Sequence, residues 1–462
     1  METIVTEILE IIKGTKDNIS QEEQLRSYFE TLICRAVSEA LERIDKELAE
    51  RYAAKGWHVE RLDARCVQAS YGTIQIRRRR MKKEGEASIY PLDKEVGIRP
   101  YRRYTAYLEY VIACIAAKSV YRDTAAVVNL LSPVTISHQQ VAHVVRRVGE
   151  TYGAWEKLQE STDPMEETEL RRPEVLYIEG DGLMLHGQNK KQLELHRFQI
   201  AEGVQENGNR RTLIGTHYVA NLDHEKAKES LLHYLESHYD LTHTLVLSNS
   251  DGGAGYTCGV FEEILGSVGR HEHFLDWYHV QRKCRERLLW ANSTLYKKLY
   301  KALYTHEREE VGLVLDTVES MSQDERQTEQ VELLRKYIER NWIYLAGLEE
   351  RGIGEYRKLL GTCESNHRLY SYRMKKQGRR WSRAGGEAMV KIITGLKNGD
   401  LREAMAAKAE WFNAKAGRDF RGAVREALKR SKRTTYDGVR HGRITVSAPM
   451  SSGIGHLSKC FA

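Results

Sequence analysis

The sequence predicts an α/β protein of several domains, in which a mixed sheet is interrupted by an all-α insertion and preceded by a mainly helical region. Three observations lead to this. At 462 residues the chain is too long for one ordinary hydrophobic core. Apolar residues recur at helical spacing before residue 55 and again from about 280 to 360. Between about 175 and 275 they form short strand-like runs separated by glycines and polar residues.

Composition indicates a globular protein that works inside the cell. Hydrophobic residues make up 41% of the chain and charged residues 30%, and no apolar run approaches the roughly 18 residues that a membrane span needs. The opening METIVTEILEII has neither the basic region nor the cleavage site of a signal peptide. The seven cysteines form no CxxC pair, so we expect reduced thiols. We therefore expect a cytoplasmic protein without a membrane partner.

Basic residues are concentrated in three runs. Lys and Arg number 72 against 65 Asp and Glu, a net charge of +7, and the surplus gathers in IRRRRMKK, RMKKQGRRWSR and REALKRSKR. Such runs suit a polyanion such as nucleic acid. A solvated helix face or an edge strand is the alternative for any single run, and three runs in one chain favour nucleic acid.

The amino-terminal region is expected to contain two modules. Residues 1–55 form amphipathic helices that could dimerise, and residues 56–100 form a small basic module with strands. In YGTIQIRRRR, Ile74 and Ile76 alternate with polar neighbours, and the strand continues into Arg77, Arg78, Arg79 and Arg80. We expect these arginines to contact DNA. The alternative is an edge strand protected by charge.

Residues 101–160 have the spacing of a helix-turn-helix. A helix ends at the Ser132-Pro133 break, and a second begins after a capping Ser137. In such a unit the start of the second helix meets base edges in the major groove. The DNA-binding candidates are therefore Ser137, His138, Gln139 and Gln140, with Arg146 and Arg147 further along the helix. Two helices that serve packing alone are the alternative.

The catalytic core is expected in residues 170–280, after a polar boundary at 161–173. Its first strand leads to Asp181, two strands complete a meander, and then a helix, a strand ending at LSNSDGG, a helix and a short strand in HFLDWYHV follow. This order matches an RNase H-like domain. An all-α insertion (281–360), a return to the core (361–415) and a basic tail (416–462) complete the chain.

Two carboxylates are placed to share a metal ion. In the RNase H-like arrangement the first and fourth strands are neighbours, so Asp181 and Asp251, each beside a glycine, come together. Carboxylates with phosphate oxygens are the ligands of Mg²⁺, and two such ions can act on one phosphate. We expect two Mg²⁺ ions, with Mn²⁺ able to substitute. An ordinary Asp-Gly turn is the alternative for either residue taken alone.

Three further acids and one histidine are candidates for the same site. Asp276 and His279 lie three residues apart where the fifth strand gives way to a helix, so both side chains fall on one face. A capping aspartate with a neighbouring histidine is the alternative. The third carboxylate is either Glu364 in CESN or Glu387 in GGEAM. Glu387 could instead serve as a favourable charge at a helix N-terminus.

Taken together, EGDG, SNSDGG, DWYH, the helical insertion, CESN, RMKKQGRRWS and GGEAM resemble the ISLre-type insertion-sequence transposases of bacteria, a DDE family related to the Mutator-like transposases. The likeness extends to YGTIQIRRRR, PLDKEVGI and SVYRDTAAVV near the amino terminus. It implies that Asp181 and Asp251 are the first two catalytic carboxylates and that Asp276 and His279 form an Asp-x-x-His element. It also places an acid before RMKKQGRRWS, which favours Glu364 over Glu387 as the third metal ligand.

The expected function is therefore that of a DNA transposase of an insertion sequence. It would cut at the ends of its element and join the freed 3′-hydroxyl to target DNA, with terminal repeats and target DNA as partners. Such proteins work as dimers or larger assemblies, associated with the bacterial nucleoid when on DNA. The rival hypotheses are a DNA-binding relative that does not cut, and a metal-dependent nuclease of the same fold that does not join strands.

Overall fold

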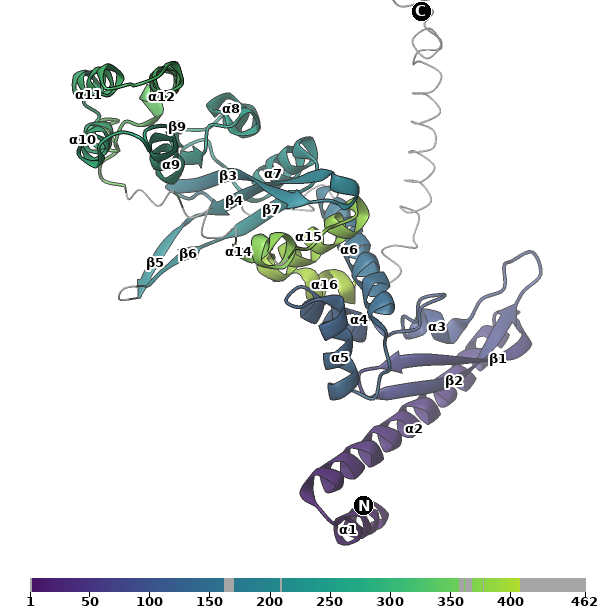
Figure 1. Cartoon of the computed structure of the whole chain (residues 1–462). Helices are drawn as coiled ribbons and strands as arrows, with labels where there is room; N and C mark the ends of the chain where they lie inside the picture. Colours follow the sequence, from purple (N-terminus) through teal and green to yellow (C-terminus); the bar gives the residue numbers. More distant parts are fainter. Residues whose placement is uncertain are drawn as a thin grey trace, which may run out of the picture. The chain divides into compact units, whose positions relative to one another are not determined.

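The structure is a computed structural model, and it describes residues 2–161, 170–207, 210–356, 361, 368–376 and 378–407. The chain is a mixed α/β protein, as the sequence predicted (Figure 1). It divides into two compact units. The larger comprises Met1–Cys34, Gln68–Thr73 and Tyr104–Met405, and the smaller includes Arg35–Val67 and Ile74–Arg103. Among the described residues, no helix is long and apolar enough to cross a membrane.

The larger unit is built around a five-stranded sheet with the order β7-β4-β3-β8-β9. The central strand β3 pairs antiparallel with β4 and parallel with β8, and β8 pairs parallel with β9. β7 pairs antiparallel with β4 at the other edge. The strands are β3 (Val175–His186), β4 (Gln192–Ala201), β7 (His217–Asn221), β8 (Leu245–Ser250) and β9 (Arg270–Leu275). Because β3 and β8 are covered on both faces, the residues from Val175 to Asp181 and all of β8 are buried without alternation, polar side chains included.

One sequence expectation about the meander needs correction. The two strands that the sequence predicts to complete the meander lie in LELHRFQIAEGV and RRTLIGTHYVANLD, but the structure divides the second run at Gly215, whose φ is +59°. The first half, β6 (Arg210–Ile214), pairs with β5 (Gly203–Asn207) in a separate hairpin, and only β7 joins the sheet. The left-handed conformation at Gly215, which glycine adopts readily, turns the chain between the two pairings.

Each face of the sheet carries its own core. On one face, α7 (His224–His238) and α8 (Cys258–Leu265) cover a cluster that includes Ile178, Phe198 and Phe261. On the other face lies a smaller cluster formed by Tyr177, Leu247, Phe274 and their neighbours. Side chains alternate along β3, so Glu179 and Asp181 lie on the same second face as Tyr177.

An all-α segment follows β9 and has its own core (Figure 1). Its helices pack their apolar faces together around Leu299, Val314 and Leu334. Leu275, the last residue of β9, and Val280 belong to the same cluster, so this segment is anchored directly at the carboxyl end of the sheet. Its elements are α9 (Trp277–Arg287), α10 (Ser293–Tyr304), α11 (Arg308–Ser320), α12 (Glu325–Asn341) and the 3₁₀ turn η3 (Trp342–Tyr344).

Helices from both sides of the sequence complete the larger unit. α6 packs closely on α15 because Gly149 lies against Ala388 and Gly395 lies against the ring of Tyr152. The helices are α1 (Glu2–Gly14), α4 (Ala106–Ala116), α5 (Tyr121–Leu131), α6 (His138–Ser161), α14 (Arg368–Tyr370), the π-helical turn η4 (Ser371–Lys375), α15 (Arg383–Asn398) and α16 (Leu401–Ala406).

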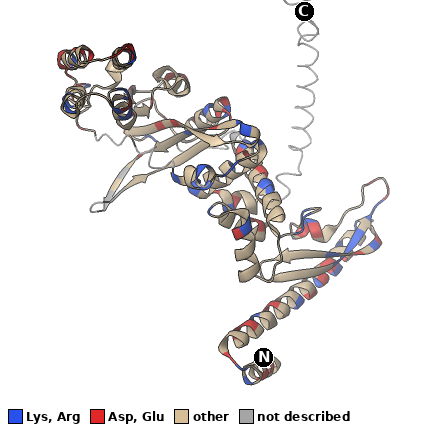
Figure 2. Cartoon of the chain, in the orientation of Figure 1, with Lys and Arg blue, Asp and Glu red and all other residues tan. Residues whose placement is uncertain are grey.

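The smaller unit contains most of a β-hairpin and the second half of a long helix. The hairpin strands are β1 (His58–Ala69) and β2 (Gly72–Lys82), the long helix is α2 (Asn18–Ala53), and a short helix α3 (Pro91–Glu95) follows. Basic residues of β2 run alongside acidic residues of this unit (Figure 2). The hairpin agrees with the strand that the sequence predicted at Ile74 and Ile76, both of which are buried.

Candidate functional site

Three aspartates form a row across the parallel part of the sheet. The β3–β8 register pairs Val175 with Leu245, an offset of 245 − 175 = 70, and the β8–β9 register pairs Leu245 with Arg270, an offset of 270 − 245 = 25. Continued just past the last paired residues, the same offsets align Asp181 with Asp251 and Asp251 with Asp276. Neighbouring strands lie about 4.8 Å apart, so the register alone brings the three carboxylates to one edge.

A fourth carboxylate lies on the same face. Glu179 is two residues before Asp181 on β3, and side chains two apart share a face of a strand. Glu179, Asp181 and Asp276 are all buried, at 2%, 7% and 7% exposure. Buried charged side chains are rare unless they are paired or bind a metal. Three buried acids on one face, with the half-buried Asp251 at its edge, therefore favour a compensating positive charge.

Backbone amides hold two of these carboxylates in place. Glu179 Oε2 accepts a hydrogen bond from the Gly361 backbone N–H at 2.8 Å and one from the side-chain amide of Asn249 (Nδ2) at 3.3 Å. Asp276 Oδ1 accepts from Tyr278 N at 3.0 Å and so caps α9, while the Asp276 amide donates to Ser250 O at 2.7 Å. These contacts orient the side chains but leave their negative charges close together.

The electrostatics of Asp276 reflect this crowding. Burial raises the pKa of the Asp276 carboxyl above its usual value of 3.8, and the nearby Glu179 and Asp181 carboxylates raise it further. The Tyr278 amide and the His279 ring act in the opposite direction, and His279 Nε2 lies 3.9 Å from Asp276 Oδ2. Proximity to several like charges disfavours ionisation, and a bound cation would relieve it.

Asp251 sits in a tight loop directly after β8. Its Oδ1 accepts from Gly253 N at 2.8 Å, and Gly252 has φ +72°, a conformation that glycine adopts without strain. The ring of Tyr256, further along the same loop, packs against Gly180. A Cβ atom added to Gly180 would lie only 2.8 Å from Cδ1 of this ring. Gly180 thus lets the loop that carries Asp251 approach β3 closely.

Positive and polar groups line the same face on β4. Arg197 is opposite Asp181 in the β3–β4 register and Gln199 is opposite Glu179. Both are almost fully buried, at 1% and 2% exposure. The Arg197 guanidinium also lies 5.1 Å from the centre of the Tyr370 ring. Arg197 is therefore the nearest built-in countercharge on β4 to the aspartate row.

The structure brings together four of the residues that the sequence proposed as catalytic, namely Asp181, Asp251, Asp276 and His279. Glu364 lies outside the described residues, so its role stays a prediction. Glu387 is exposed and its carboxylate is 3.1 Å from Arg383 Nε, an ordinary ion pair one helical turn apart. Glu179 was not predicted as a site residue. The signal was present as the Glu-x-Asp spacing on a strand, which puts both acids on one face.

The arginines of β2 are largely engaged within the smaller unit. Arg79 pairs with the buried Asp45 at 2.6 Å, Arg80 pairs with Glu60 at 3.1 Å, and Arg78 pairs with Asp93. Arg77 alone among the four is exposed. Alternation places Arg77 and Arg79 on one face, but Arg79 is held by Asp45, so Arg77 is the best placed of the four for an external phosphate.

The second helix of the proposed helix-turn-helix begins as the sequence indicated. Gln140 N donates to Ser137 Oγ at 3.3 Å, and Ser137 N donates to Gln140 Oε1 at 2.9 Å, which is a reciprocal capping box. Gln140 is thus engaged in the cap. Arg147 is also engaged, since its guanidinium contacts the buried Glu109 at 2.5 Å. His138, Gln139 and Arg146 are exposed.

The fold and site together define an α/β protein with a buried carboxylate row at the carboxyl ends of parallel strands. The family model that matches residues 18–411 is the uncharacterised protein family UPF0236. The chain belongs to UPF0236. The resemblance to ISLre-type transposases of the DDE family is corrected by this match, because short motifs suggested that family whereas the full-length comparisons name UPF0236 alone.

The relatives support this assignment over most of their length. A UPF0236 protein in the vanSb 3′ region of Streptococcus gallolyticus is 37% identical over 399 residues, covering 86% of this chain and 87% of the relative. UPF0236 protein TTE0610/TTE0881/TTE1053/TTE2432 of Caldanaerobacter subterraneus subsp. tengcongensis is 26% identical over 448 residues, covering 94% of this chain and 87% of the relative.

The crowding predicts that Asp276→Asn stabilises the metal-free protein at neutral pH. The raised pKa means that the fold disfavours the ionised Asp276, so its cost appears as pH rises above the ordinary value of 3.8 and is absent below it. Asparagine keeps the cap on α9 and removes the charge. In EDTA, the variant should melt at a higher temperature than wild type at pH 7, and the difference should shrink at pH 4.

The matched control is Glu329→Gln, because Glu329 is an exposed residue of α12 that the site does not use. This control should leave the melting temperature nearly unchanged at both pH values. A lower melting temperature for Asp276→Asn at pH 7 would show that the aspartate is stabilised by its surroundings and would contradict the crowding.

Proposed function

We propose that this chain is a metal-dependent DNA transposase, which cuts at the ends of a mobile element and joins the freed 3′-hydroxyl to target DNA. The single observation that carries the proposal is the row of Asp181, Asp251 and Asp276 with Glu179 beside it. Buried oxygen ligands with little sulfur or nitrogen among them suit Mg²⁺ or Mn²⁺ rather than a transition metal such as zinc.

The strand order supports an RNase H-like core for this site. The antiparallel meander β3-β4-β7 followed by the parallel strands β8 and β9 is the order expected of such a core. The all-α segment that starts at Trp277 occupies the place of the expected insertion. Ligands of open α/β sheets bind at the carboxyl ends of parallel strands, where the four acids lie.

The residues fit a divalent ion by their own chemistry. Asp181 and Asp251 would hold it, with Glu179 and Asp276 at its sides, and Glu364 stays a further candidate. When bound, such ions neutralise charge on a phosphate and activate the attacking oxygen. His279 lies at the start of α9 next to Asp276, where it would contact a phosphate oxygen. Arg197 would hold Asp181 in position from the β4 side.

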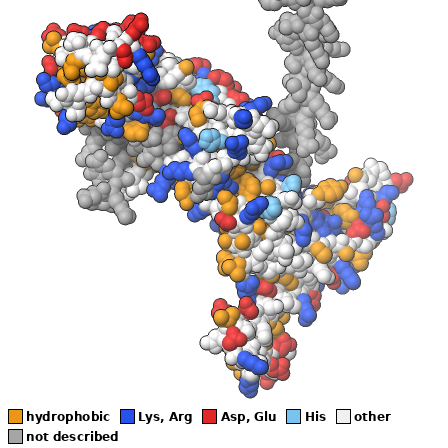
Figure 3. Space-filling view, in the orientation of Figure 1, with side chains coloured by type: hydrophobic (Ala, Val, Ile, Leu, Met, Phe, Trp, Pro, Cys, Tyr) orange, Lys and Arg blue, Asp and Glu red, His pale blue; other side chains and the backbone are white. Residues whose placement is uncertain are grey.

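The exposed residues of α6 support a DNA-binding role for the helices before the core. His138 and Gln139 lie in the first turn of a capped helix that follows the α5–α6 connection, as a base-reading helix requires. Leu130 and Leu131, at the end of α5, are 72% and 70% exposed, and the face of the molecule drawn in Figure 3 mixes basic and apolar side chains. A surface of this kind suits a polyanion with an apolar contact.

Self-association is part of the proposal, because paired element ends need more than one protein copy. Helix α1 has no buried residue, and its apolar residues Val5, Leu9 and Ile12 are 48%, 46% and 43% exposed. Such a stripe suits a second helix.

The printed names of the relatives also support a mobile element. The printed name of one Caldanaerobacter relative consists of four labels separated by slashes, and the name of another consists of a longer series of such labels. Several loci of one organism under a single protein name are what repeated copying of an element would leave.

Asp181→Asn and Asp251→Asn should each abolish magnesium-dependent cleavage of a duplex carrying the element's ends. The lost charge stabilisation is several kcal/mol, a fall of roughly 100-fold or more in rate at 1.36 kcal/mol per tenfold. Folding and DNA binding should persist, because the amide is isosteric. Glu329→Gln, at an exposed position on α12, is the control and should cut like wild type.

Three outcomes of this assay distinguish a transposase, a nuclease and a non-cutting relative, and a fourth tests the site itself. Cutting and strand joining by wild type, both lost in the variants, supports a transposase. Cutting without joining indicates a nuclease of the same fold. DNA binding with no cutting by wild type in Mg²⁺ or Mn²⁺ indicates a non-cutting relative, and equal cutting by the aspartate variants would remove the site from the reaction.

Gln139→Ala should change DNA sequence preference without changing stability. Gln140→Ala should lower stability and leave the sequence preference unchanged. Gln139 is exposed, and Gln140 caps α6, so its loss should cost about 0.5–2 kcal/mol of stability. The measurements are competition binding between element ends and random duplex, and thermal melting. If both variants keep the preference for element ends, the base-reading residues lie elsewhere in the chain.

A further inference from the structure

A second group of metal-binding side chains lies on the opposite face of the sheet from the aspartate row. Cys258 is the first residue of α8, Glu262 is one turn later on the same side of that helix, and His271 is on β9. On β9, His271 lies one position before Glu272 and three before Phe274, and both of those residues face the aspartate side. Alternation along the strand therefore turns His271 toward α8.

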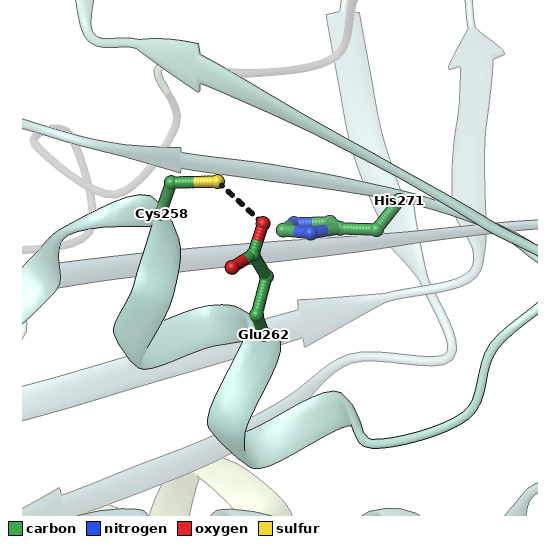
Figure 4. A group of neighbouring side chains, drawn as sticks. All are labelled: Cys258, Glu262 and His271. Carbon is green, nitrogen blue, oxygen red and sulfur yellow. Dashed lines mark hydrogen bonds between the residues drawn. The ribbon is translucent and has the colours of Figure 1, made fainter.

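The three side chains point toward one another (Figure 4). The Cys258 thiol donates to Glu262 Oε1 at 3.4 Å, and one ligand atom from each residue lies within 4.8 Å of the other two. In a tetrahedral site with metal–sulfur and metal–oxygen bonds of about 2.3 and 2.0 Å, sulfur and oxygen stand about 3.5 Å apart. The observed separation of sulfur and oxygen already has that length.

A chain of hydrogen bonds sets which nitrogen of His271 is available. It starts at the Tyr256 carbonyl, which can only accept, so the Ser250 hydroxyl donates to it at 2.5 Å. Ser250 Oγ then accepts from His273 Nε2 at 3.4 Å. A neutral His273 carries its proton on Nε2, and its Nδ1 accepts from the Ser248 hydroxyl at 2.7 Å. The direction of each hydrogen bond in this chain follows from the direction of the one before it.

The last step of the chain concerns His271. The Ser248 hydroxyl directs its proton toward His273, so its oxygen accepts a hydrogen bond from His271 Nε2 at 2.7 Å. The proton of His271 therefore sits on Nε2, and Nδ1 keeps its lone pair. Within the described ranges, no hydrogen bond reaches His271 Nδ1. A ring whose other nitrogen is held by a hydrogen bond is the arrangement of metal-binding histidines.

We propose that Cys258, Glu262 and His271 bind one ion of the zinc class, with water as the fourth ligand. A thiolate, an imidazole and a carboxylate are zinc ligands, whereas Mg²⁺ and Ca²⁺ take oxygen ligands almost alone. Binding would displace the thiol proton of Cys258 to solvent. The ion would join the first turn of α8 to the edge strand β9. This site is separate from the aspartate row and does not depend on the proposed function.

The experiment is a titration of the EDTA-treated full chain with Co²⁺, which replaces zinc and gives a thiolate-to-cobalt absorption band. Wild type should bind one equivalent with this band, and Zn²⁺ should displace it. Cys258→Ser should lose the band. Glu262→Gln, at an exposed position that does not threaten folding, should weaken binding, and Ser248→Ala should weaken it by roughly 10–100-fold because it releases the His271 ring.

Two controls locate the site. Cys66→Ser removes an exposed thiol elsewhere and should leave the band unchanged, and Asp181→Asn should also leave it unchanged, because the aspartate row has no sulfur. A band that survives Cys258→Ser, or one that Cys66→Ser removes, overturns the proposal. Absence of any band in folded wild type overturns it as well, whatever the outcome of DNA-cleavage assays.

Discussion

Repulsion of the buried Asp276 carboxylate by the nearby Glu179 and Asp181 carboxylates is the constraint on which the sheet of the larger unit depends. Glu179, Asp181, Asp251 and Asp276 are held there by strand register, by glycines that admit a close loop and by backbone amides. Burial and the neighbouring acids raise the pKa of the Asp276 carboxyl, and a cation bound at this point would relieve the repulsion.

The sheet explains why the acids converge although they are far apart in sequence. Two parallel pairings with constant offsets carry three aspartates to one row, and the antiparallel pairing of β3 with β4 places Arg197 next to the first of them. The all-α segment begins at the residue after the third aspartate, and its core includes Leu275. Movement of that segment would therefore be transmitted directly to Asp276 through the cap of α9.

Much of this could be predicted from the sequence, and the failures have physical reasons. Apolar runs followed by Asp-Gly predicted Asp181 and Asp251, because both are local signals, but β3 does not end at Asp181 as expected and continues to His186 through its pairing with β4. The burial of Glu179 and the pairing of Arg78, Arg79 and Arg80 depend on partners distant in sequence, which periodicity does not reveal. Gly215 divided a run that looked like one strand. Short motifs also suggested the wrong family, since matches of a few residues carry less information than a full-length comparison.

The most direct test of the carboxylate site is to locate a bound ion by anomalous scattering from crystals grown with Mn²⁺. The account predicts a peak about 2.0–2.2 Å from oxygens of Asp181 and Asp251, with Asp276 or Glu179 within the same coordination sphere or bound through water. The peak should vanish in Asp181→Asn crystals. Full occupancy of Mn²⁺ elsewhere, with the aspartate row empty at millimolar Mn²⁺, would contradict the claim that this row is a metal site.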